Sequence, residues 1–347
     1  MKMIYVAPLT TEPDRDSSWI DAFASLGCEV LTFGTFFNVQ KEGIVDRIFR
    51  RFNIGKANRQ MQLDLLKLAA VEHPDWIHFR LPLNFDRKTI FSLRNNGIII
   101  TQYFNDDPFS RRAPFGLHWK YRNAIPAYNA HFVFRALNIQ SYLNVGASHV
   151  EHCPPYYDPK LYINSTSSTA LNRFLADVAF IGHWENDWRV DCLDSLIRHG
   201  YSVILKGGMW DQAIQGREIG KLAPITHAFG EEYNHIYANV VAGLCFFSKI
   251  NNDTWTRRAL EIVAAGGVLV CERTDEAQKY FKDREEAYFF SSIEELIKIV
   301  EDLKSNPAKR HHVRAAGYER LLNSRNTIND RAKEVYKFVE NNRRANP

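Results

Sequence analysis

Short apolar runs alternate along the chain with segments in which apolar residues recur every three or four positions. The short runs predict buried strands, and the periodic segments predict amphipathic helices. In the first half, the predicted strands are residues 2–7, 29–33, 76–80, 97–102, 131–135 and 149–153, and the predicted helices include residues 18–26, 57–72 and 138–143. Strands that alternate with helices in this way predict an α/β fold with a parallel, doubly wound sheet.

The same alternation returns in the second half. The predicted strands there are residues 177–181, 202–205, 241–247, 267–271 and 287–290, and the predicted helices are residues 188–199, 233–238, 255–264 and 293–304. Prolines at 154, 155 and 159, with a polar run at 164–169, predict a linker between two Rossmann-like domains. We therefore expect domains at 1–165 and 166–325. The segment 308–342 is predicted to be helical throughout, with residues 326–347 returning to the first domain.

Composition narrows the class of protein. The chain has 347 residues, of which 45% are hydrophobic and 24% charged, which is typical of a soluble globular protein with two domains. Its 44 Lys and Arg against 40 Asp and Glu give a net charge of +4, too small to indicate nucleic-acid binding. No run approaches the roughly 18 apolar residues of a membrane span, and no signal-peptide core is seen. We expect a cytoplasmic protein whose five scattered cysteines are reduced.

A basic amphipathic stretch at residues 43–52 has two interpretations. Its apolar residues lie on one side of a helix, and Arg47, Arg50 and Arg51 lie on the other. This pattern is typical of a surface helix packed on a sheet, and also of a helix that contacts a membrane interface. Both interpretations stay open at this point.

Candidate chemistry is sought in the loops that follow strands, because ligands of doubly wound sheets bind there. Gly182 and His183 end one predicted strand and lead into a helix that bears Arg189. A glycine lets the backbone approach a ligand, and a helix N-terminus with a nearby arginine can bind an anion. Lys206 beside Gly207 and Gly208 offers a further cation after the next strand.

The most informative segment runs from residue 251 to residue 267. Asp253 or Thr254 is expected to cap a helix, with the Thr256 hydroxyl and the Arg258 guanidinium in its first turn. This arrangement favours a diphosphate at the helix N-terminus. Glu261, one turn further on, is placed to accept hydrogen bonds from a ribose diol. The alternative is an Arg258–Glu261 surface ion pair, which has the same spacing.

Two sequence patterns resemble known glycosyltransferases. Asp253 and Glu261 resemble the donor-site motif of retaining glycosyltransferases of family 4. Thr256-x-Arg258-x-x-Glu261, followed by residues 266–274, resembles the group-1 glycosyltransferases related to the spore-maturation protein CgeB. The resemblance continues through residues 285–290 and 310–320, and so covers essentially the whole second domain. In the first domain, residues 103–108 are similar to the acidic Asp-Asp-Pro segment of the same relatives.

The resemblance implies a GT-B fold, with two Rossmann-like domains facing across a cleft. It also implies a nucleotide-sugar donor on the second domain and an acceptor on the first. In the family pattern, Gly182 matches the glycine after the strand, and Arg189 lies near the residue that holds donor phosphates. Three positions differ: His183 replaces Arg, Asp253 replaces Glu, and Asn326 replaces His.

The acidic pair Asp106-Asp107 is expected to bind sugar hydroxyls or to accept the acceptor's proton. A turn before Pro108 is the alternative role for the pair. A metal ion is not expected, because adjacent residues point in different directions and no other ligands are evident. The negative charge on the leaving diphosphate is instead expected to be stabilised by the helix N-terminus and by Arg258, Arg189 and Lys206.

Together these features predict a glycosyltransferase of hexosyltransferase type that needs no cofactor or metal. Its partners would be a nucleoside-diphosphate sugar and the hydroxyl of a glycan, lipid-linked or protein acceptor, with no nucleic acid. Retention of configuration and a role in surface polysaccharide assembly are expected by analogy. The alternatives are a nucleotide-sugar epimerase or hydrolase, a glycosidase with paired carboxylates, and a non-catalytic nucleotide-sugar-binding protein.

Overall fold

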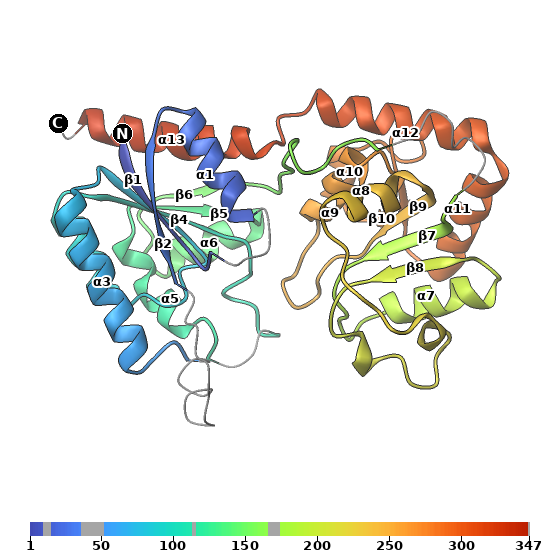
Figure 1. Ribbon diagram of the computed structural model, residues 1–347, viewed down its shortest axis with the longest axis horizontal. Helices are drawn as coiled ribbons and strands as arrows, with labels where there is room; N and C mark the ends of the chain where they lie inside the picture. The colour runs from blue at the N-terminus through green and yellow to red at the C-terminus, as the bar shows by residue number, and fades with distance from the viewer. Residues whose placement is uncertain (10–14, 36–51, 113–115, 166–173, 346–347) are drawn as a thin grey trace. The chain divides into compact units, whose positions relative to one another are not determined.

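The computed structural model describes residues 1–9, 15–35, 52–112, 116–165 and 174–345 (Figure 1). It divides the chain into two compact units. Unit 1 comprises Met1–Pro154 and Ile328–Pro347, and unit 2 comprises Pro155–Thr327. Residues 43–51 of the basic amphipathic stretch and residues 166–169 of the polar run lie outside the described residues.

Unit 1 is built on a six-stranded sheet with strand order β2-β1-β3-β4-β5-β6, in which every neighbouring pair is parallel. Connections between parallel strands must cross over the sheet, so helices cover both of its faces. The strands are β1 (Lys2–Ala7), β2 (Glu29–Gly34), β3 (Trp76–Arg80), β4 (Ile99–Phe104), β5 (Ala130–Val133) and β6 (Val150–His152). The carboxyl ends of these strands share one edge, where the Asp106-Asp107 loop begins.

Helices α1 and α13 pack together on one face of this sheet, and α3 and α5 lie on the other (Figure 1). The α4 helix begins where the Asp86 side chain accepts a hydrogen bond from the Thr89 amide at 2.9 Å. The C-terminal helix is tied down by the Arg331 Nε bond to the Pro154 carbonyl at 3.1 Å. The helices are α1 (Arg15–Ser25), α3 (Lys56–Glu72), α4 (Arg87–Asn95), α5 (Trp119–Ala124), α6 (Ile139–Asn144) and α13 (Ile328–Ala345).

Unit 2 has a five-stranded parallel sheet with strand order β11-β10-β9-β7-β8. Every residue of the central strands β7 and β9 is buried, as expected for parallel strands covered on both faces. The strands are β7 (Ala176–Ile181), β8 (Val203–Lys206), β9 (Val240–Cys245), β10 (Leu269–Glu272) and β11 (Tyr288–Phe290). The helices are α7 (Arg189–Arg198), α8 (Gly230–Ala238), α9 (Arg257–Ala264), α10 (Ala277–Tyr280), α11 (Ile293–Ser305) and α12 (Pro307–Leu322).

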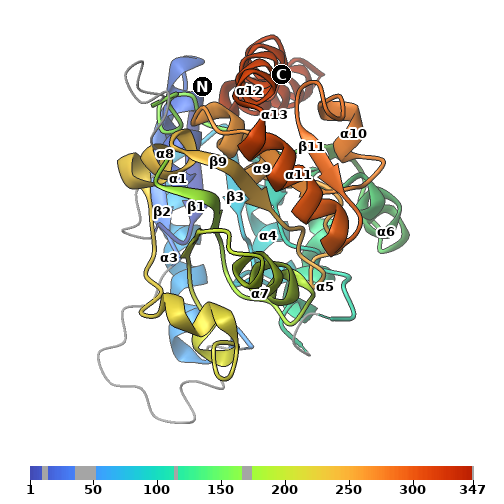
Figure 2. The ribbon, with the colours of Figure 1, turned by 90° about the vertical axis from the view of Figure 1, so that its right-hand side faces the viewer.

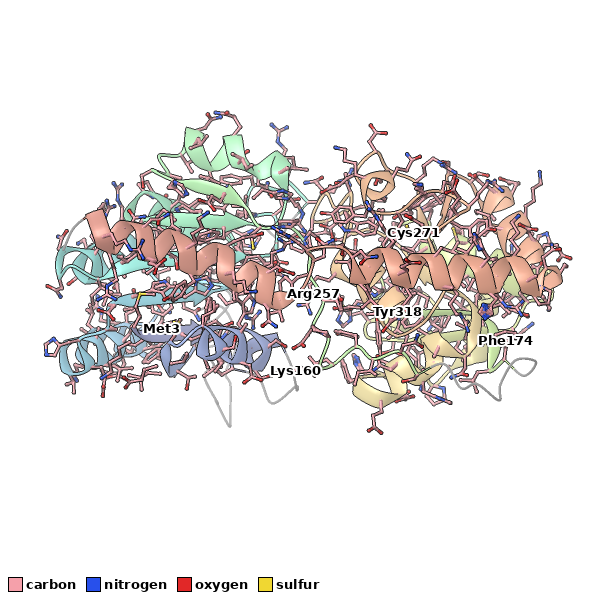
Figure 3. The ribbon with its side chains drawn as sticks, turned by 90° about the horizontal axis from the view of Figure 1, so that it is seen from above. Met3, Lys160, Phe174, Arg257, Cys271 and Tyr318 are labelled. Carbon is pink, nitrogen blue, oxygen red and sulfur yellow. The ribbon has the colours of Figure 1, made fainter. Side chains whose placement is uncertain are left out.

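Two apolar clusters form the core of unit 2, one on each face of the sheet. Helices α7 and α11 pack side by side over one cluster (Figure 2). Helices α8 and α9 cover the other cluster, and α12 packs on α9. Tyr318 reaches this second cluster from α12 (Figure 3). The α9 helix is therefore held on its apolar side while its N-terminus lies at the carboxyl edge of the sheet.

The predicted α/β class with parallel sheets is confirmed, but the predicted continuous helix at 308–342 is wrong. The chain forms α12 and α13 with a break at residues 323–327. In the break, the Tyr157 amide donates to the Asn326 carbonyl at 2.9 Å, and Tyr157 pairs with Thr327 as an isolated bridge. These contacts satisfy backbone groups outside the helix at the point where the chain leaves unit 2.

Candidate functional site

Two glycines bring the loops after β7 and β8 into direct backbone contact. The Gly182 amide donates to the Lys206 carbonyl at 2.8 Å. A Cβ on Gly207 would lie 2.0 Å from the Gly182 carbonyl oxygen, and Gly207 has a φ of +129° that disfavours other residues. Gly182 and Gly207 therefore meet backbone to backbone at the carboxyl edge of the unit 2 sheet, and this pair is called here the glycine floor.

Arg258 lies against this glycine floor. A Cβ on Gly182 would be 3.0 Å from both Cζ and Nη1 of Arg258, and the guanidinium lies 5.5 Å from the Phe180 ring centroid. In the described parts of the chain, no side chain or carbonyl forms a hydrogen bond or ion pair with Arg258. A partly buried guanidinium that has no such partner among the described residues is suited to bind an anion.

The α9 helix begins next to Arg258, but later than predicted. Its N-cap is Thr256, whose side chain makes no capping hydrogen bond, so the prediction that Asp253 or Thr254 caps this helix is wrong. Thr254 instead donates to the Glu276 carboxylate, and its carbonyl accepts from the Thr274 hydroxyl at 2.6 Å. The Asp253 amide donates to the Ser248 carbonyl at 2.9 Å. These bonds hold the loop before α9, whose N-terminus carries the positive end of the helix dipole.

Glu261 lies one turn into α9 and is 8% exposed. Its carboxylate pairs with Arg257 at 3.1 Å, and Tyr233 donates to it at 3.4 Å. Arg257 is the first residue of α9, labelled in Figure 3, and its guanidinium also lies over the Tyr156 ring at 4.5 Å. The surface pair considered from the sequence, Arg258 with Glu261, is not the one observed. Arg257 takes that role, and Arg258 is left to the glycine floor.

Aromatic side chains border the glycine floor. His183 is exposed, and its Nδ1 would lie 2.8 Å from a Cβ on Gly208. The His183 ring is 6.0 Å from the His227 ring, which stacks on Phe229 at 5.6 Å with an interplanar angle of 8°. Such flat faces suit a planar or sugar ring. Lys206 turns to the neighbouring segment, where its ammonium lies 2.9 Å from Thr226 Oγ1 and 3.0 Å from Glu232.

Arg189 does not have the open position expected of a phosphate ligand. It is 3% exposed, and its guanidinium donates to both oxygens of Asp187 at 2.7 Å and to the His183 carbonyl at 2.7 Å. Asp187 compensates the charge of Arg189 within the loop between β7 and α7. Arg189 therefore braces this loop, and the sequence interpretation of it as a diphosphate ligand is corrected.

The two acidic residues of unit 1 differ in their surroundings. Asp107 is 2% exposed and accepts hydrogen bonds from the Phe109 amide at 2.9 Å and from Asn138 Nδ2 at 2.8 Å. It builds the turn, which was the alternative role considered for it. Asp106 is partly exposed. Burial lowers the pKa of His118, and the negative charge of Asp106 opposes part of that shift. Asp106 is thus the member of the pair open to a ligand.

The described residues offer no candidate for a metal site or a membrane span. Within the described ranges, no three His, Cys, Asp or Glu side chains are grouped so that they could hold a metal ion. The described helices include none that is long and apolar enough to span a membrane. All five cysteines are buried and free.

Sequence reasoning missed one ionic cluster at the same edge of the unit 2 sheet. Glu272, at the end of β10, accepts hydrogen bonds from Trp188 Nε1 at 2.6 Å and from Lys249 Nζ at 2.8 Å. The available signal was an acidic residue that closes an otherwise apolar strand. Its partners lie in two loops distant in sequence and could not be inferred without the fold.

The chain is similar to a described protein family and to several solved structures. Residues 189–337 match the model of a family described as glycosyl transferase-like. No curated protein matches the chain. Among solved structures, the chain is similar to a sucrose-phosphate synthase from Thermosynechococcus elongatus, with a TM-score of 0.73, 12% identity and coverage of 99% of this chain and 100% of the other.

Two further solved structures are similar over nearly their whole lengths. Trehalose 6-phosphate synthase from Burkholderia multivorans has a TM-score of 0.68 and 12% identity, covering 100% of this chain and 99% of the other. HepE from Anabaena, in complex with UDP and glucose, has a TM-score of 0.63 and 12% identity, covering 98% and 100%. The predicted GT-B fold is confirmed by these similarities. Most of unit 2 matches a glycosyl transferase-like family, as the sequence resemblance led us to expect.

Proposed function

We propose that the protein is a glycosyltransferase that moves a sugar from a nucleoside-diphosphate sugar to an acceptor hydroxyl. The observation that carries this proposal is the position of the Arg258 guanidinium against the glycine floor, without a hydrogen-bond or ion-pair partner among the described residues. The family match over residues 189–337 and the UDP bound in the similar HepE structure support it. The subgroup we propose is the one related to the spore-maturation protein CgeB.

In the proposed reaction, the bond between the anomeric carbon and the diphosphate oxygen breaks as the acceptor oxygen bonds to the same face of the sugar. The acceptor's proton passes to the departing diphosphate, so configuration is retained and no protein nucleophile is needed. Arg258 and the positive end of the α9 helix dipole stabilise the negative charge that grows on the diphosphate. This stabilisation needs no divalent metal. Glu261 receives the ribose hydroxyls, and Asp106 on unit 1 serves the acceptor hydroxyl.

The finer assignments belong to the same proposal. The transferred group is a hexose, the acceptor is a glycan, lipid-linked or protein hydroxyl, and the enzyme works in the cytoplasm in assembly of surface polysaccharide. Peripheral contact with a membrane is assigned to residues 43–52, and cosedimentation of a triple Arg47, Arg50, Arg51→Ser variant with anionic vesicles would test it. If the variant cosediments as the wild type does, that assignment fails.

A non-catalytic nucleotide-sugar-binding protein is the second candidate. It is favoured by Asp107, whose carboxylate is buried in its own turn, and by Arg189, which is neutralised by Asp187. Incubation of the metal-free chain with UDP-glucose and GDP-mannose, in the presence of a mixture of sugar and lipid-linked acceptors, separates the two. A transferase releases nucleoside diphosphate in an acceptor-dependent manner, whereas a binder retains the intact donor.

A further inference from the structure

Glu272 is a buried carboxylate at the carboxyl edge of the unit 2 sheet, 5% exposed. One of its oxygens accepts hydrogen bonds from Trp188 Nε1 at 2.6 Å and from Lys249 Nζ at 2.8 Å. The other oxygen accepts from the Phe247 amide at 2.5 Å. A single carboxylate thus receives three donors from two loops, the one between β7 and α7 and the one between β9 and α9.

These two loops are the ones that carry the candidate site. The first contains Gly182 and His183, and the second leads into α9 and Arg258. A second contact joins the same loops, because Glu185 accepts a hydrogen bond from the Lys249 amide at 3.1 Å. Hydrogen bonds to a buried charged acceptor are stronger and more directional than neutral ones. The relative position of the loops is therefore set by Glu272 as well as by apolar packing.

We propose that Glu272 is a positioning residue for the diphosphate: it ties the β7 and β9 loops together so that the glycine floor and Arg258 face the same ligand. This inference rests on the proposed function. Glu272 acts through Trp188, Phe247 and Lys249, since its own oxygens are taken up by these donors. Its effect is expected in nucleotide affinity and in loop order, beyond any effect on folding.

The chain offers a matched control for this proposal. Asp177, 9% exposed, lies at the amino end of β7, on the opposite edge of the same sheet. Its carboxylate also receives three donors: the Ser202 amide and hydroxyl, each at 2.9 Å, and Lys304 Nζ at 2.9 Å. Glu272→Gln and Asp177→Asn make the same chemical change in equivalent networks, so both should lower the melting temperature. Only the first change touches the site loops.

The test uses the full chain without metal and two measurements. The first is calorimetric binding of UDP, GDP, ADP and TDP. Glu272→Gln should lower the affinity for the diphosphate that binds by about tenfold or more, because it disturbs a charged hydrogen-bond network. The affinity of Asp177→Asn should stay within about twofold of the wild-type value. The second is amide exchange without ligand, which should become faster at residues 182–188 and 247–256 in Glu272→Gln alone.

The outcomes separate the two claims. Equal affinities of Glu272→Gln and Asp177→Asn for the diphosphate, or unchanged exchange in both loops, overturn the positioning role. A wild-type chain that binds none of the four diphosphates overturns the proposed function. In that case the exchange comparison still decides whether Glu272 holds the loops together.

Discussion

Lowering the pH from 8 to 5 should destabilise unit 1 much more than unit 2. His78 and His131 are fully buried in unit 1, and burial lowers the pKa of each to about 3. The His131 ring nitrogens lie 2.9 Å from Gln102 Nε2 and 2.9 Å from the Ile125 carbonyl, a pattern that suits the neutral ring. His78 Nδ1 contacts Thr101 Oγ1 at 2.8 Å, and its Nε2 has no partner among the described residues.

The size of the effect follows from proton linkage. In the unfolded chain a histidine has a pKa of about 6.5, so at pH 5 the unfolded state binds protons that the folded state rejects. The depressed folded pKa means that stability is complete above pH 6.5 and is lost as the pH falls from there towards 3. At pH 5 each histidine lowers the free energy of unfolding by about 2 kcal/mol, or about 4 kcal/mol together. This figure depends little on the folded pKa, provided that it lies well below 5.

The assay is hydrogen exchange of the full chain at pH 8, 7, 6 and 5, corrected for the intrinsic pH dependence of exchange. It compares the slowest amides of β3 and β4 in unit 1 with those of β7 and β9 in unit 2. A His78→Phe variant, which keeps the aromatic packing around Trp19 and Phe23, should lose about half of the pH-dependent destabilisation. The control is His311→Gln, an exposed histidine on α12, which should change nothing.

Two results would refute the reasoning. One is a free energy of opening in unit 1 that falls no further than that of unit 2 between pH 8 and pH 5. The other is a His78→Phe variant with the same pH dependence as the wild type. Either result would mean that the two imidazoles are protonated in folded unit 1, or become exposed to solvent without unfolding of unit 1.

Three further predictions concern the site. Gly207→Ala places a Cβ 2.0 Å from the Gly182 carbonyl and should cost about 2 kcal/mol or more in chemical denaturation, whereas Gly200→Ala, with nothing within 4 Å of its Cβ, should cost about 1 kcal/mol. Arg189→Ala leaves Asp187 without its partner and should lower the melting temperature markedly, while Arg258→Ala should keep the melting temperature and lose diphosphate affinity by calorimetry. In transfer assays Asp106→Asn should lower kcat at an unchanged donor KM. In urea denaturation Asp107→Asn should destabilise unit 1 by about 1–2 kcal/mol, because it disturbs a buried turn. If the two variants had the same kinetics and the same stability, this distinction would be refuted.

Strand positions could be predicted because burial on both faces gives central parallel strands a continuous apolar run. In β9 all six residues are buried, and the run stands out in the sequence. Strand ends were less accurate: the run predicted at 97–102 is β4 at Ile99–Phe104, since Gly97 belongs to the turn before the strand. The break between α12 and α13 could not be predicted, because it depends on the pairing of Thr327 with Tyr157, far away in sequence.

The candidate site shows the same limit. Arg258 and the glycines could be found from local spacing, because a helix start and a strand end define where they lie. The role of Arg189 could not be predicted, because in the sequence Arg189 and Arg258 are both basic residues near a helix N-terminus. Only the fold shows that Asp187 neutralises Arg189 and that Arg257 forms the ion pair with Glu261. Glu272 was missed because Trp188 lies 84 residues away from it along the chain.

The most direct test of the central claim is calorimetric titration of the metal-free chain and of its Arg258→Ala variant with UDP, GDP, ADP and TDP. The account predicts that the wild type binds one of these diphosphates and that Arg258→Ala, with its fold intact by melting temperature, loses about tenfold or more of that affinity. A wild type that binds none of them, or a variant that binds as tightly as the wild type, would contradict a diphosphate site at Arg258 and the glycine floor.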